Sequence, residues 1–127
     1  MIVVNAVFEA NEATIAALQP AVAAMETASR AEPGCVDYTF SVELNNPNVM
    51  RITEKWTTLE DLQAHFAMPH MADFQAAMAA HPPQGVSANF YEVTEIDVPR
   101  QTSSQYVTVT DLGRCDIPHP ARALDVP

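Results

Sequence analysis

Two stretches in which apolar and polar side chains alternate constrain the fold of this chain more than any other feature. Residues 36–42 carry Val, Tyr, Phe and Val at every second position, and residues 50–56 carry Met, Ile, Glu and Trp in the same way. A period of two is typical of β-strands with one buried face. The Asn-Asn-Pro-Asn run at residues 45–48 is typical of a hairpin loop. The sequence therefore predicts a pair of strands joined by a hairpin.

Two further strands and one long helix are expected around this pair. Residues 2–9 alternate with apolar side chains on both faces, and residues 88–96 alternate more loosely. Residues 13–31 repeat apolar side chains at three- and four-residue spacing, which predicts a helix. Pro20 either kinks this helix or opens its longer segment after a short first turn.

The segment after the hairpin predicts two shorter helices. Thr57 and Glu60 form a capping box, which is typical of a helix start. Pro69 suits the first turn of the next helix. His81, followed by two prolines, ends it. The order of strand, helix, strand, strand, helix and strand predicts an α+β fold of the ferredoxin-like, split βαβ type. Such a sheet has one face covered by helices, and a second copy of the chain is the simplest cover for the other.

Length and composition set the number of domains. The chain has 127 residues, of which 48% are hydrophobic, enough for one core and too little for two. We expect one domain over residues 1–96. Residues 97–127 hold four of the ten prolines and are expected to form a C-terminal arm, in which residues 105–110 could be one more strand. The arm either packs on the domain or the partner subunit, or is a disordered tail.

Charge and cysteine usage exclude several classes of function. The chain has 16 acidic residues against 6 Lys and Arg, which disfavours nucleic acid as a partner. It has no apolar run of membrane-spanning length and no signal-peptide pattern at its start, so a cytoplasmic protein without membrane contact is expected. Cys35 and Cys115 lie in no zinc or CxxC spacing.

Several short motifs together resemble a known family. They are Glu-Pro-Gly-Cys at residues 32–35, Thr-Glu-Lys-Trp at 53–56, Ala-His at 64–65 and Pro-His-Met at 69–71. This series resembles the antibiotic biosynthesis monooxygenase domain, especially its small bacterial quinol monooxygenases, over residues 2–96. The resemblance implies a homodimer with a dimeric α/β barrel and a small pocket between sheet and helices. Members of the family oxidise phenols or quinols with oxygen without metal or flavin, degrade haem, or isomerise small molecules.

Asn5 and His65 are the predicted catalytic residues. Asn5 is an amide in an apolar strand, and it either makes a structural hydrogen bond or donates to a substrate oxygen, as the resemblance implies. His65 is a natural base near neutral pH, or alternatively bridges the junction of two helices. His70 lies five residues further on, across a helix break, and no third ligand is evident, so no metal site is predicted. Glu54 is interpreted as structural, either paired, protonated or exposed at the sheet margin.

The remaining candidate residues are large side chains that could form pocket walls or simply pack in the core. The haem-degrading branch is disfavoured, because Gln75 and His65 fall where those members carry a histidine and a tryptophan. The predicted substrate-pocket residues are Trp56, Tyr38, Phe66, His70, Met71 and Phe74.

The leading functional hypothesis, carried mostly by the resemblance, is a cofactor-independent monooxygenase. It would oxidise a quinol or polycyclic phenol with molecular oxygen, with the substrate supplying the electrons. One alternative is an isomerase or related proton-transfer enzyme acting on a small carbonyl compound. The other is a dimer that binds a small molecule without catalysis. In each case the expected partners are a second copy of the chain and a small molecule, with no cofactor.

Overall fold

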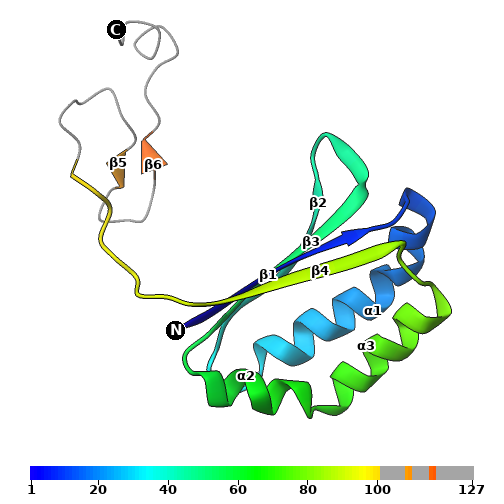
Figure 1. Cartoon of the computed structure of the whole chain (residues 1–127), viewed down its shortest axis with the longest axis horizontal. Helices are drawn as coiled ribbons and strands as arrows, with labels where there is room; N and C mark the ends of the chain where they lie inside the picture. Colours follow the sequence, from blue (N-terminus) through cyan, green and yellow to red (C-terminus); the bar gives the residue numbers. More distant parts are fainter. Residues whose placement is uncertain (101–107, 110–114, 117–127) are drawn as a thin grey trace, which may run out of the picture. The chain divides into compact units, whose positions relative to one another are not determined.

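Residues 1–94 form a four-stranded antiparallel sheet with helices packed against one of its faces (Figure 1). The computed structural model describes residues 1–100, 108–109 and 115–116. The strand order β2-β3-β1-β4 confirms the predicted ferredoxin-like α+β fold. In chain order the elements of this unit are β1 (Ile2–Glu9), α1 (Glu12–Arg30), β2 (Cys35–Glu43), β3 (Asn46–Trp56), α2 (Leu59–Phe66), α3 (Pro69–Ala80) and β4 (Gly85–Glu92).

The chain divides into two compact units, Met1–Thr94 and Glu95–Pro127. In the second unit, β5 (Thr108–Val109) pairs antiparallel with β6 (Cys115–Asp116). Strand β5 lies inside the stretch 105–110, for which a strand was expected. The other residues of that stretch, and any packing of the arm on the domain or on a partner, lie outside the described residues.

Helix α1 begins at a polar cap and runs unbroken to the turn before β2. The Asn11 side chain accepts a hydrogen bond from the Thr14 backbone N–H at 2.8 Å, which satisfies one of the free donors at the helix start. The helix continues through Pro20 as one element. Its buried side chains Leu18 and Met25 belong to the core. None of the helices in the described part of the chain is both long and apolar enough to cross a bilayer.

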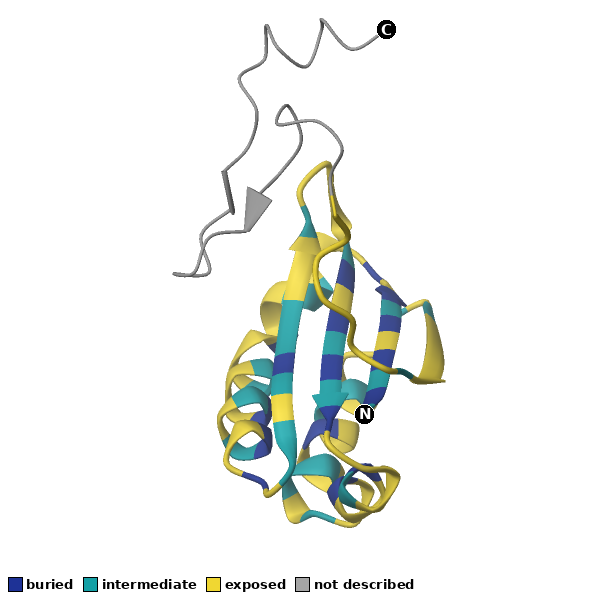
Figure 2. Ribbon diagram, turned by 90° about the vertical axis from the view of Figure 1, so that its left-hand side faces the viewer, coloured by how far each residue is buried: buried dark blue, intermediate teal, exposed yellow. Residues whose placement is uncertain are grey.

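The two faces of the sheet differ because side chains alternate along each strand. On β1, Val4 and Ala6 are buried in the core, whereas Asn5 between them is exposed. Pairing places Asn5 opposite Thr53 of β3 and opposite Asn89 of β4, which gives a polar row on the face away from the helices. Figure 2 shows the resulting alternation of buried and exposed residues along the strands. The helices of this unit therefore cover one face of the sheet only.

Strand β2 lies at an edge of the sheet, and α1 covers part of that edge. The Phe40 backbone N–H donates to the Glu26 carboxylate at 2.8 Å, and the Arg30 Nε–H donates to the Tyr38 carbonyl at 2.9 Å. Free backbone groups on an edge strand are a template for unwanted strand pairing. These two side-chain bonds occupy such groups and attach α1 to the sheet.

The turn between α1 and β2 depends on Gly34. Its φ of +80° lies in the left-handed region, which favours glycine. The Gly34 carbonyl accepts from the Thr57 backbone N–H at 2.9 Å, so the turn is bonded to the chain just before α2. A Cβ at this position would overlap the Asp61 carboxylate and lie 2.8 Å from the Thr57 hydroxyl oxygen. The close approach of the turn to α2 therefore requires glycine.

We expect Gly34→Ala to lower the free energy of unfolding by at least about 1–2 kcal/mol, the typical cost of a left-handed conformation for a residue with a Cβ. The overlap with Asp61 adds to this cost. Urea denaturation followed by circular dichroism measures it. Gly85→Ala is the matched control, because a Cβ there meets only the Glu9 side chain, whose flexible carboxylate oxygen is the nearest atom at 3.3 Å. Equal losses in the two variants would contradict the assignment.

Candidate active site

An apolar cavity of about 180 Å³ lies between the helix-facing side of the sheet and the helices. We call it the sheet–helix cavity. Of the six predicted pocket residues, Tyr38, Met71 and Phe74 line it. Its remaining walls are mostly aliphatic and aromatic, and its polar side chains are those of Tyr38, Glu54 and Gln75. The cavity thus combines an apolar lining with a single carboxyl group.

Glu54 is that carboxyl group, and its environment raises its pKa above the ordinary value. The residue is only 8% exposed. Burial raises the pKa of the Glu54 carboxyl, while the hydrogen bond from Trp56 and the charge of His65 act in the opposite direction and the charge of Glu32 adds to the rise. The Trp56 indole N–H donates to Glu54 Oε1 at 3.0 Å. A carboxyl whose pKa is raised in an apolar cavity is suited to proton transfer.

Of the three alternatives given for Glu54, exposure at the sheet margin is wrong, because the side chain is buried, and the paired form is confirmed by the hydrogen bond from Trp56. Glu54 lies on the same face of β3 as Ile52 and Trp56, and both of these are buried on the helix side. The alternation along β3 was visible in the sequence and indicates a carboxyl pointing toward the core. A buried carboxyl needs a partner, and the structure identifies the partner as the indole of Trp56.

Tyr38 lies beside Glu54 in the wall of the cavity. Burial raises the pKa of the Tyr38 phenol, and the nearby Glu54 charge raises it further. The phenol therefore stays neutral. Its ring meets the rings of His65 and Trp56 edge-on, with centroids 5.2 Å and 6.3 Å apart. These contacts fix the position of the aromatic wall.

Glu32, His65 and His70 form a second polar group, here called the Glu32 cluster. His65 Nδ1 and His70 Nε2 lie 2.6 Å and 2.7 Å from the same oxygen, Oε2 of Glu32. The expectation that no third group joins the two histidines is wrong, because the turn after α1 brings Glu32 between α2 and α3. The Glu-Pro-Gly-Cys motif was the available signal, but its distance in sequence from the histidines concealed the contact.

The donor set of the Glu32 cluster is one that transition metals accept, and its ligand atoms lie within 4.8 Å of one another. The spacing, however, is that of hydrogen bonds. With bonds of about 2.0–2.1 Å to a tetrahedral ion, two ligand atoms lie roughly 3.3 Å apart. Both nitrogens of the Glu32 cluster are closer than this to the shared oxygen. The arrangement therefore fits a carboxylate that accepts two hydrogen bonds.

The other predicted residues occupy three different places. Asn5 lies on the sheet face away from the helices, so the two predicted catalytic residues, Asn5 and His65, lie on opposite sides of the sheet. The reason is the period of two, which turns Asn5 away from the side of Val4. Trp56 and His65 are fully buried behind the cavity wall. Phe66 is half exposed and contacts Phe90, a lining residue, at a centroid distance of 6.3 Å.

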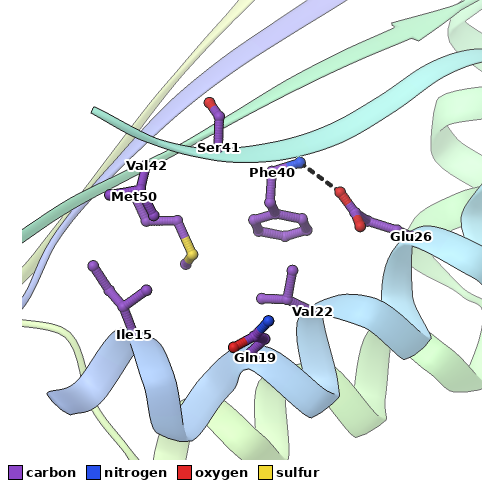
Figure 3. Close-up of a pocket in the computed structure, with 8 residues that line it drawn as sticks. All are labelled: Ile15, Gln19, Val22, Glu26, Phe40, Ser41, Val42 and Met50. Atoms are coloured by element: carbon purple, nitrogen blue, oxygen red, sulfur yellow. Dashed lines mark hydrogen bonds between the residues drawn. The ribbon is translucent and has the colours of Figure 1, made fainter. Parts of the chain in front are cut away.

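A larger cleft of about 330 Å³ lies between α1 and the strands β2 and β3 (Figure 3). Ile15, Val22 and Phe40 project into it. Its ionisable side chain is Glu26, which accepts the Phe40 N–H at 2.8 Å and pairs with Arg30 at 3.5 Å. Because this carboxylate is already engaged, the cleft offers less acid–base chemistry than the sheet–helix cavity.

Comparison with known proteins points to one family. The sequence model of the antibiotic biosynthesis monooxygenases matches residues 1–77. A candidate antibiotic biosynthesis monooxygenase from Deinococcus radiodurans is 25% identical, with a TM-score of 0.72 over 80% of this chain and 100% of its own. Rv0793 from Mycobacterium tuberculosis is 22% identical, with a TM-score of 0.67 over 76% of this chain and 98% of its own, and shows the fold alone. No curated protein matches significantly.

Glu54→Gln should stabilise the protein at neutral pH. The unfolded chain loses the Glu54 proton near pH 4.5, the ordinary value, whereas the folded chain holds it to higher pH. The free energy of unfolding of the unmodified protein therefore falls as pH rises from 4.5 through the raised pKa. The variant lacks this fall and can still accept the Trp56 hydrogen bond. Urea denaturation between pH 4 and pH 8 measures the difference.

The exposed Glu92→Gln is the control for this experiment. It should keep the pH dependence of the unmodified protein. If Glu54→Gln shows no gain in stability relative to this control as pH rises, Glu54 does not have a raised pKa in the folded protein.

Proposed function

This chain belongs to the antibiotic biosynthesis monooxygenase family, and from that premise we propose that it oxidises a small quinol or related phenol with molecular oxygen, without a cofactor. The observation that carries the proposal is the sheet–helix cavity with Glu54 as its single carboxyl. Such a site can bind a flat aromatic ring and remove the proton of a hydroxyl group on that ring.

The size of the cavity favours a small substrate. An apolar protein cavity of about 150 Å³ is large enough to bind benzene. The sheet–helix cavity, at about 180 Å³, therefore suits one ring with substituents or two fused rings better than a polycyclic phenol. Met71, Met78 and Phe74 provide a lining that adapts to flat rings. The lining side chains Val86 and Phe90 are half exposed, so the cavity opens along β4.

Glu54 supplies the acid–base step. Its carboxylate accepts the proton of a substrate hydroxyl, and the resulting phenolate is more strongly reducing. The phenolate passes one electron to oxygen, and the two radicals combine on a ring carbon. The peroxide then leaves one oxygen on the ring and releases the other as water, with the proton returned by Glu54. One quinol and one oxygen molecule thus give one hydroxyquinone and one water, and the substrate supplies all four electrons.

A second copy of the chain is the proposed cover for the sheet face that carries Asn5. The row formed by Thr39, Thr53, Asn5 and Asn89 is uncharged and holds both donors and acceptors. A twofold axis through such a row can pair it with itself. In this arrangement Asn5 makes hydrogen bonds in the dimer interface and does not contact the cavity. Glu54 then has the catalytic role that was expected for Asn5.

Oxygen uptake by the purified full chain tests the proposed reaction. One-ring hydroquinones and two-ring naphthohydroquinones should be consumed above the autoxidation background. Glu54→Gln should lower kcat/KM by about 10²-fold or more, a typical effect of removing an acid–base group. Absence of uptake across both classes would refute the proposal. Turnover that continues without oxygen would instead support the proton-transfer alternative on a carbonyl compound.

Filling the cavity tests whether the substrate binds there. Ala88→Phe places a ring in the cavity wall and should lower kcat/KM by roughly tenfold or more for two-ring quinols, with a smaller loss for one-ring quinols. Steady-state kinetics on both classes measures this. The control is Ala76→Phe, at an exposed position of α3 outside the lining. Equal losses in the two variants would place the reaction elsewhere.

The dimer is tested by sedimentation equilibrium of the full chain, which should give twice the monomer mass. Thr53→Lys places a charge in the polar row of each copy and should weaken association by about tenfold or more. The control Gln63→Lys lies at an exposed position of α2 and should leave association unchanged. A monomeric unmodified chain at micromolar concentration would contradict the dimer.

A further inference from the structure

The Glu32 cluster brings together three elements that are far apart in sequence. Glu32 lies in the turn after α1, His65 in α2 and His70 at the start of α3. Both imidazoles use one oxygen of the Glu32 carboxylate, at 2.6 Å and 2.7 Å. The His65 side chain is fully buried, and that of His70 is 19% exposed. The cluster therefore leads from the protein interior to a partly exposed imidazole.

The hydrogen bond to Glu32 determines which tautomer of the His65 imidazole is present. A carboxylate accepts, so His65 Nδ1 carries the proton and donates it to Glu32. When the ring is neutral, its Nε2 then holds a free lone pair. This Nε2 is buried and has no hydrogen-bond partner among the described residues. A buried imidazole whose Nδ1–H is held by a carboxylate is the arrangement that makes Nε2 a proton acceptor in hydrolase triads.

The His65 ring is connected to the cavity carboxyl through Trp56. The His65 ring packs on Trp56 with centroids 4.8 Å apart, and Trp56 donates to Glu54. His65 and Glu54 are near enough for their charges to interact. Three other ionisable groups interact electrostatically with Glu54. They are Tyr38 and Cys35 of β2 and Glu32 of the turn. Among these neighbours, His65 is the one that can become a cation.

We propose that Glu32 and His70 are positioning residues that hold His65 as the charge-compensating neighbour of Glu54. This rests on the proposed function, in which Glu54 takes the substrate proton. An ionised carboxylate in an apolar cavity is unfavourable unless a positive charge is near. A proton on Nε2 makes His65 that charge, with its Nδ1–H still bonded to Glu32. His70 keeps the Glu32 carboxylate in place and gives the cluster its contact with solvent.

The proposal is tested without substrate, so its outcome does not depend on the oxidation reaction. Protein labelled with ¹³C at the glutamate carboxyl carbon is titrated by NMR, and the Glu54 signal is assigned by its absence in Glu54→Gln. In His65→Gln the Glu54 midpoint should move to higher pH, because the compensating charge is gone. His70→Ala should move it in the same direction, because Glu32 is then less well compensated. His81→Ala, at an exposed histidine of the α3 end, is the control.

His70→Gln retains a hydrogen-bond donor, so its Glu54 titration midpoint should lie between those of His70→Ala and the unmodified protein. A Glu54 midpoint that stays unchanged in a folded His70→Ala would overturn the proposal, even if His65→Gln does not fold. If quinol oxidation is found, the acidic limb of kcat/KM should shift with the same variants, while a purely structural role would lower kcat/KM equally at all pH values.

The unmodified protein provides a second measurement. Long-range ¹H–¹⁵N spectra should show His65 protonated at Nδ1 and, at high pH, unprotonated at Nε2. The opposite tautomer would overturn the proposal. So would a stoichiometric transition metal in the purified protein, detected by mass spectrometry, together with loss of the Nδ1 proton, because the cluster would then be a metal site.

Discussion

The pairing register of β3 with its two neighbours is the constraint on which the site depends. It turns Glu54 toward the helices together with Ile52 and Trp56, and it turns Thr53 toward the opposite face. A shift of one residue would exchange the two faces. The cavity carboxyl would then lie in the polar row, and the apolar lining would face away from the helices. The hairpin between β2 and β3 and the long pairing of β1 with β3 together prevent such a shift.

Buried polar groups connect this sheet to the helices. Glu54 accepts from Trp56, His65 packs on Trp56, and the Glu32 carboxylate joins His65 to His70. Polar groups in an apolar interior favour one arrangement strongly, because each is costly when its partner is lost. The same groups that specify how α2 and α3 pack also surround the cavity carboxyl. The packing of the helices and the raised pKa of Glu54 are therefore properties of one set of contacts, and raising this pKa has a cost in stability.

Local patterns were sufficient for the elements and the family. The alternation along β2 and β3 and the proline at the start of α3 depend on neighbours within a few residues. The capping box predicted at Thr57 and Glu60 was displaced by one residue, because Thr58 caps α2 and accepts from the Asp61 backbone N–H. The polar groups of the candidate site were harder to predict. Asn5 was placed in the cavity by analogy, although Val4 and Ala6 already marked the other side as buried. Glu32 was missed because a carboxylate in a turn has no local pattern that points to histidines more than thirty residues away.

The sequence by itself determined the order of strands and helices, the buried side of β2 and β3 and the membership of the family, because these follow from periodicity and short motifs. Only the tertiary structure decided which polar groups meet. The turn at Gly34 brings Glu32 against α2 and α3, and the packing of the helices on the sheet leaves a cavity whose one carboxyl is Glu54. A hydrogen bond requires its two heavy atoms to lie about 3 Å apart in space, whatever their separation in the sequence. Such contacts therefore form only when distant segments pack together.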